Sequence, residues 1–180
     1  MVQEIEKMHI YLSQKMLKES ISAFAETVNA CDCNKILPLI ADGDKELSSN
    51  AAYVLLFAYK GCENQLLEQT SFIMEVIQTT PYDKTRRLLL SLLERLALDT
   101  VNVNVKFLDY CFTNILSVKV ACAIKASCIR LAFRQCAAYE ELLSELKMVL
   151  DTMDDSMLAP SVASARRNIM KKIDSTLSIR

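Results

Sequence analysis

Residues 80–97 read TPYDKTRRLLLSLLERLA, and this stretch contains both a helix start and a helix interior. Thr80, Pro81 and Asp83 stand in the order expected for an N-cap, a first-turn proline and a first-turn acid. Leucines then recur at spacings of three and four, as on the buried face of an amphipathic helix. The stretch therefore predicts a helix over 81–97.

The same apolar spacing continues through almost all of the 180 residues, and no run of strict alternation bounded by turn residues interrupts it. Hydrophobic residues make up 52% of the chain, which has only two glycines and three prolines. This composition excludes disordered and collagen-like chains. We therefore predict an all-α protein with helices near 46–60, 63–77, 81–97, 104–117, 119–135, 138–152 and 160–176.

The sequence also predicts where helices begin and end in the first 61 residues. The segment 1–30 predicts either one long helix or two helices broken inside 13–20. Asn34 is a plausible N-cap of a short helix that ends at a turn, Asp42-Gly43-Asp44. Gly61 is expected to close the helix before it in a left-handed conformation.

The predicted helices form pairs that recur at regular intervals along the chain. The second helices of successive pairs are predicted to begin near 46, 81, 119 and 160, so the start positions are separated by 35, 38 and 41. Two-helix units of this length are typical of TPR, HEAT and armadillo α-solenoids, and the absence of tryptophan disfavours the TPR pattern. We predict a HEAT/armadillo-like solenoid of about four to five helix pairs, with an irregular helical bundle as the alternative.

A single domain over 1–180 is expected, in which 1–32 form one or two capping helices and 33–180 form the repeats. Six short motifs add to this prediction: Ala51-Ala52-Tyr53-Val54-Leu55, Arg86-Arg87-Leu88-Leu89-Leu90, Leu108-Asp109-Tyr110-Cys111-Phe112, Ala123-Ile124-Lys125-Ala126, Glu141-Leu142-Leu143 with Glu145-Leu146, and Ser164-Ala165-Arg166-Arg167 with Lys171-Lys172-Ile173. From about residue 46 to 175 the chain resembles a family of small bacterial HEAT-like repeat proteins of unknown function. Tyr53 departs from the family pattern, which often has tryptophan there.

Some members of that family carry an adenylosuccinate-lyase label, which implies a Ser-Ser-x-Met-Pro-x-Lys-x-Asn loop. Ser48-Ser49-Asn50 holds the only Ser-Ser pair, and neither methionine nor proline follows it. The one histidine, His9, lies outside the region of resemblance. Cys31-x-Cys33 has the wrong spacing for a zinc knuckle. We therefore predict that the chain is not an enzyme and that it has no catalytic residue, metal or cofactor.

The seven cysteines are an odd number, and several stand among apolar residues, so reduced thiols are the simpler interpretation. Charged residues interrupt the N-terminus, and no window approaches 18 uncharged apolar residues. A cytoplasmic protein without a membrane partner is therefore expected. The 21 basic and 22 acidic residues nearly balance, so any electrostatic function requires local segregation of charge.

Such segregation is present. The predicted helices 81–97, 119–135 and 160–176 are basic, whereas the helices that precede them are acidic or neutral. In HEAT-like solenoids the second helices resemble a row along the concave surface, so the basic side chains are expected to form one ridge. The candidate partner-binding residues are Lys84, Arg87, Arg95, Lys119, Arg130, Arg134, Arg167 and Lys171.

The favoured function is a scaffold whose concave basic face binds a protein or another acidic partner. The alternative is binding of a DNA backbone, because the architecture resembles that of DNA-alkylation-repair HEAT-like proteins, which use tryptophans that this chain lacks. A lyase is the least favoured function. Any single arginine could instead pair with a carboxylate of a neighbouring helix, and the oligomeric state is left open.

Overall fold

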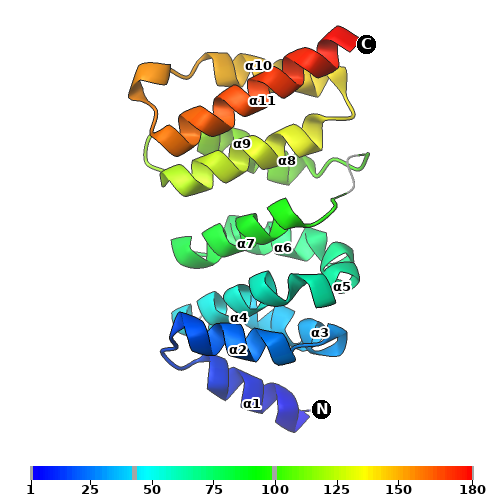
Figure 1. Ribbon diagram of the computed structural model, residues 1–180, viewed down its shortest axis with the longest axis vertical. Coiled ribbons are helices and arrows are strands. Elements are labelled where there is room, and N and C mark those ends of the chain that lie inside the picture. The colour runs from blue at the N-terminus through cyan, green and yellow to red at the C-terminus, as the bar shows by residue number, and fades with distance from the viewer. Residues whose placement is uncertain (1, 42–43, 99–100, 180) are drawn as a thin grey trace. The chain divides into compact units, whose positions relative to one another are not determined.

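A computed structural model describes residues 2–41, 44–98 and 101–179, and the chain divides into two compact units. Unit 1 comprises residues 1–97 and unit 2 comprises residues 98–180. All regular elements of the described residues are helices, which confirms the all-α prediction (Figure 1). The turn predicted at Asp42-Gly43 lies outside the described residues, and the single-domain expectation stays a prediction.

Unit 1 is built from α1 (Val2–Leu12), α2 (Lys18–Thr27), α3 (Ala30–Ile40), α4 (Lys45–Ala58), the 3-10 helix η1 (Tyr59–Gly61), α5 (Glu63–Glu68), α6 (Thr70–Thr79) and α7 (Asp83–Arg95). Helix α4 packs against α2, α3 and α7, while α6 packs against α7. The N-terminal region forms two helices, so the broken alternative is the one that the chain adopts. The single helix predicted over 63–77 is instead α5 and α6, with a break at Gln69.

Helix α3 starts four residues before the predicted N-cap, Asn34. The reason is a capping box: the Asn29 side chain accepts hydrogen bonds from the backbone N–H groups of Cys31 (2.9 Å) and Asp32 (3.2 Å). The Asp32 carboxylate in turn accepts from the Asn29 N–H. Asn29 therefore satisfies the free amides of the first turn, and Asn34 lies inside the helix.

Two other predicted helix ends are wrong by small amounts. Helix α7 begins at Asp83, and the Thr80 hydroxyl accepts from the Tyr82 N–H (3.3 Å) before the helix instead of capping it. No glycine among the described residues has a positive φ, so Gly61 does not form a left-handed cap. Instead α4 ends at Ala58 and tightens into η1.

The second helices of the pairs are more evenly spaced than predicted. They begin at Lys45, Asp83, Cys122 and Pro160, so their start positions are separated by 38, 39 and 38. In the described residues the pairs are α3 with α4, α6 with α7, α8 with α9 and α10 with α11. Four pairs agree with the predicted number.

The interface between α4 and α7 holds a small buried polar network inside an aliphatic core. The Thr85 hydroxyl lies 3.2 Å from the Ser48 hydroxyl and 3.1 Å from the Ser49 hydroxyl, and all three side chains are buried. The Ser48 hydroxyl also donates to the Ile40 carbonyl oxygen (2.7 Å). Ser48 and Ser49 therefore hold α3, α4 and α7 together, which is a structural role.

One cysteine pair contradicts the prediction of reduced thiols throughout. Cys33, in α3, and Cys62, just before α5, form a disulfide with their Cα atoms 6.3 Å apart. The two residues are 29 positions apart in the sequence, and both are fully buried. The packing of α3 against α5 brings them together, and no spacing motif signals such a pair. The free cysteines of the described residues are Cys31, Cys111, Cys122, Cys128 and Cys136.

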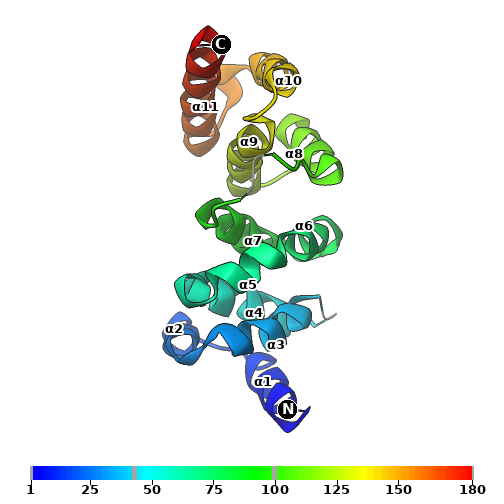
Figure 2. The same ribbon diagram turned by 90° about the vertical axis from the view of Figure 1, so that its right-hand side faces the viewer.

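Unit 2 is built from α8 (Val105–Leu116), α9 (Cys122–Cys136), α10 (Glu140–Asp151), the 3-10 helix η2 (Asp155–Met157) and α11 (Pro160–Ile179). Helices α9 and α11 form one layer and α8 and α10 form the other (Figure 2). Phe107, Ile129 and Leu146 are among the fully buried side chains between the layers. Burial raises the pKa of the Cys111 thiol well above its ordinary value, as expected for a packing cysteine.

Candidate partner-binding surface

The candidate residues of unit 1 stand on the solvent face of α7. Lys84 and Arg87 are exposed, lie one turn apart, and make no ion pair with any described residue. Arg95, at the end of α7, is held more firmly: its guanidinium donates to the Leu56 carbonyl oxygen (3.2 Å) and lies 5.3 Å from the centre of the Tyr59 ring. All three side chains are exposed, but Lys84 and Arg87 differ from Arg95 in having no charge partner among the described residues.

Lys119 does not belong to the α9 stripe on which it was predicted. Helix α9 starts at Cys122, and Lys119 lies in the preceding turn, where its backbone N–H donates to the Ser117 hydroxyl (3.3 Å). Ser117 is extended and Ala121 has a non-helical ψ of 137°, so this turn is separated from both flanking helices. The Lys119 side chain is exposed and has no partner among the described residues.

Arg130 and Arg134 do lie on α9, but both are half-buried. The Arg130 guanidinium donates to the Ser127 hydroxyl one turn earlier (3.2 Å). Neither arginine is a free cation. For these two arginines the alternative interpretation applies: the side chain interacts within its own chain and is not free for a partner.

Arg167 and Lys171 form the clearest exposed pair. They lie one turn apart on the outer face of α11, and no described side chain pairs with either of them. The neighbouring Lys172 lies over the ring of Phe133 in α9, with its ammonium 5.8 Å from the ring centre. Helices α9 and α11 pack side by side (Figure 1), and Lys172 is the cation of α11 that contacts the half-exposed Phe133 ring.

Arg166, next in sequence to Arg167, has a different role. Its guanidinium donates to the Leu150 carbonyl oxygen (2.7 Å) and to the Asp155 carboxylate (2.8 Å), and it lies 3.7 Å from the Asp151 carboxylate. Only 14% of its side chain is exposed. Arg166 therefore fixes the segment between α10 and α11 and adds little free charge.

The other layer of unit 2 is acidic at its surface. A hollow of about 580 Å³ between α8 and α10 is lined by Asp109, Glu141 and Glu145 together with apolar residues. All three acids are exposed. The two layers of unit 2 thus present opposite charge, in agreement with the predicted segregation by helix type.

The candidate set is divided between the units. Lys84, Arg87 and Arg95 belong to unit 1, and the other five residues belong to unit 2. The row across three helices therefore stays a prediction, whereas the exposed pair Arg167 and Lys171 and the contact of Lys172 with Phe133 are features of unit 2 alone. Lys172 stands in a basic motif of the sequence and Phe133 among its apolar positions, but the contact between them is not predictable, because it joins two helices that are far apart in the sequence.

No catalytic or metal centre stands out in the part of the chain that the structure describes. No group of three or more histidine, cysteine, aspartate or glutamate residues lies close enough there to hold a metal ion. No described helix has the length and apolar character that crossing a membrane requires. The half-buried His9 is part of α1.

Comparison with family models matches residues 8–173 to a HEAT repeat domain, which covers nearly the whole chain. The chain therefore belongs to the HEAT repeat domain family, and the prediction of an all-α solenoid is confirmed. The match offers no support for the lyase label. Comparisons with curated proteins and with solved structures found no match.

Proposed function

We propose that this chain is a binding scaffold and that the α9–α11 layer of unit 2 binds an acidic segment of a partner protein. The observation that carries the proposal is the pair Arg167 and Lys171, which are exposed and have no partner among the described residues. Two cations one turn apart attract carboxylates, and an arginine can hold a carboxylate through two parallel hydrogen bonds. Binding of this kind requires no catalytic step.

Three further features support the proposal. HEAT repeat domains commonly act in protein interactions, and this chain belongs to that family. The half-exposed Phe133 ring, which Lys172 contacts, offers an apolar contact on the same α9–α11 layer. The acidic α8–α10 layer would orient an acidic partner toward the opposite layer through repulsion.

A cytoplasmic location remains a prediction of the sequence. Reduced cysteines were one reason for this prediction, and the Cys33–Cys62 disulfide contradicts that reason, because disulfides are rare in the cytosol.

The proposal is tested with a fluorescein-labelled 16-residue peptide rich in glutamate, whose binding is followed by fluorescence anisotropy at 50 and 200 mM NaCl. We expect saturable binding that weakens with salt, because the contact is between exposed charges. The double variant Arg167→Glu with Lys171→Glu should weaken binding at least about tenfold. A 20-base-pair DNA duplex, titrated in parallel, tests the nucleic-acid alternative.

The matched control is Lys60→Glu with Lys106→Glu, which makes the same change in net charge at two exposed lysines outside the candidate set. This control should change the affinity less than about twofold. Equal losses in both double variants would show that only net charge matters and would reject the α9–α11 site. Tighter binding of the duplex than of the peptide would replace the acidic protein partner with a nucleic acid.

A further inference from the structure

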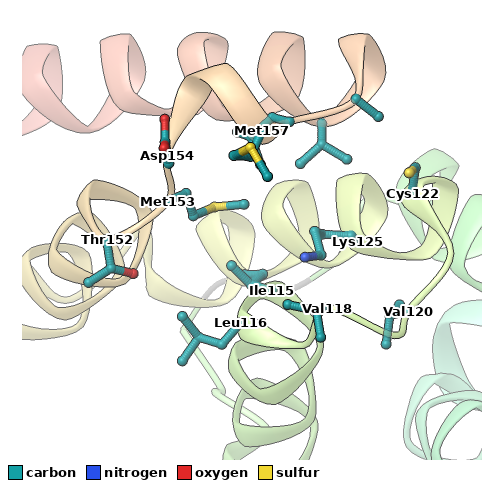
Figure 3. A pocket seen from close by; sticks show the side chains of 13 residues that line it. Ile115, Leu116, Val118, Val120, Cys122, Lys125, Thr152, Met153, Asp154 and Met157 are labelled. Carbon is teal, nitrogen blue, oxygen red and sulfur yellow. The ribbon is translucent and has the colours of Figure 1, made fainter.

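Unit 2 contains a second hollow, of about 350 Å³, which the basic residues described above do not line, and its walls are mainly apolar. It lies where the turn before α9 meets the segment that joins α10 to α11 (Figure 3). Ile115, Val118 and Val120 line one side, and Met153, Met157 and Val162 line the other. The volume falls at the lower end of the range of small-molecule sites.

Three apolar side chains at this hollow are exposed to solvent. Val118 is 93% exposed and Met157 is 81% exposed. Leu116, beside them, is 55% exposed. Covering these side chains with an apolar group would be favourable in proportion to the area removed from water.

A single cation stands among these apolar walls. Lys125 enters the hollow from α9, is half-buried, and makes no ion pair or side-chain hydrogen bond with any described residue. In Figure 3 its ammonium end points into the hollow on the side of Ile115. A partly desolvated ammonium without a partner is unfavourable, and a carboxylate placed beside it would remove that penalty.

Two other polar side chains of the lining are already engaged. The Thr152 hydroxyl donates to the Val149 carbonyl oxygen (2.7 Å). The Asp154 carboxylate accepts hydrogen bonds from the Ser156 N–H (2.9 Å) and hydroxyl (2.8 Å), which lower its pKa and keep it charged. A peptide segment would find few partners for its amide groups here, whereas an alkyl chain needs none.

We propose that this hollow binds a medium-chain fatty carboxylate, with the alkyl chain between the aliphatic and methionine side chains and the carboxylate on the Lys125 ammonium. The flexible thioethers of Met153 and Met157 suit an alkyl chain of variable length. This site uses none of the residues assigned to the acidic partner, so the two proposals stand independently.

The experiment is a 1H–15N NMR titration of the full chain with sodium octanoate, and with 1-octanol as the neutral probe of the same chain length. Octanoate should shift the amide signals of the lining residues saturably. Lys125→Met should weaken octanoate binding about tenfold, because it removes a charge-assisted hydrogen bond, and should leave octanol binding within about twofold. Lys119→Met is the matched control, since Lys119 is an exposed lysine of the adjacent turn that does not line the hollow.

The proposal is overturned if octanoate shifts signals across the whole chain without saturation, or if Lys125→Met binds octanoate as tightly as the unaltered chain. It is also overturned if an acidic leucine-containing peptide shifts the lining residues while octanoate does not, since the hollow would then be a protein-docking site. Because Lys125→Met introduces an unbranched apolar side chain, its fold is checked by the unchanged signals of Phe107 and Leu146, which are buried in unit 2 away from the hollow.

Discussion

The side-chain amide of Asn50, in α4, donates a hydrogen bond to the carbonyl oxygen of Leu12, 2.9 Å away at the end of α1. The same amide nitrogen donates to the Gln14 carbonyl oxygen, also at 2.9 Å. Asn50 is only 1% exposed and Leu12 is fully buried, so the bond between them replaces water that cannot reach the Leu12 carbonyl group. The Asn50 side chain therefore supplies a hydrogen-bond donor to a carbonyl group at the C-terminal end of α1 and joins α1 to α4.

Asn50→Ala should lower the free energy of unfolding by about 1 to 2 kcal/mol, because the buried Leu12 carbonyl group loses its donor. Urea denaturation followed by circular dichroism measures the change. Asn64→Ala, which alters an exposed asparagine of α5, should change the value by less than about 0.5 kcal/mol. An equally small effect at Asn50 would show that α1 does not depend on this contact.

Arg166 and Arg167 are neighbours in α11, and their substitution should affect stability differently, because Arg166 has a structural role and Arg167 lies free at the surface. Arg166→Met should destabilise the protein by about 1 to 2 kcal/mol, since Leu150 and Asp155 lose their charged donor. Arg167→Met should leave stability unchanged within about 0.5 kcal/mol, because Arg167 contacts no described side chain through its charge. Thermal unfolding of both variants provides the comparison, and the reverse order of stability would contradict the assignment.

Alkaline pH should destabilise the protein through its buried thiols. Burial, with a smaller contribution from the nearby Glu145 carboxylate, raises the pKa of Cys136 to about 12. In the unfolded chain a thiol ionises near pH 8.5, so above that pH the unfolded state loses its proton first and the folded state loses relative stability. The free energy of unfolding should therefore fall between about pH 8.5 and 12.

Cys136→Ala should make this dependence on pH shallower, whereas Cys122→Ala, at an exposed cysteine, should leave the slope unchanged. Urea denaturation at intervals from pH 7.5 to 11 measures the slope. Identical slopes in the two variants would show that the Cys136 thiol does not contribute.

The Cys33–Cys62 disulfide should stabilise unit 1 by about 3 kcal/mol, because it closes a loop between residues 29 positions apart in the unfolded chain. Urea denaturation with and without dithiothreitol tests this value. The unreduced, denatured protein should contain five reactive thiols. Seven reactive thiols after purification under oxidising conditions would contradict the pairing.

The fold class was predictable because a helix leaves a periodic signal in its own sequence. The leucines of 81–97 predicted α7 to within two residues at each end. Boundaries were less predictable where capping groups compete: Asn29 rather than Asn34 caps α3, since only Asn29 has Asp32 in place to complete the capping box. The even spacing of the second helices emerged once those ends were fixed.

The candidate site was only partly predictable. Arg167 and Lys171 are exposed as expected, and their spacing of four residues places them on one helix face. Arg130 and Arg134 share that spacing, yet both are half-buried and engaged. The spacing of residues predicts which side chains share one face of a helix, but it does not predict how deeply neighbouring helices bury that face.

By itself, the sequence determined the all-α class, the pairing of helices and the separation of charge between them, because each of these depends on residues a few positions apart. The tertiary structure alone decided which cations are free, that Cys33 meets Cys62, and that Lys125 enters an apolar hollow. These features join residues that are distant in the sequence, so they exist only once helices pack against one another. Burial and electrostatic pairing are properties of that packing.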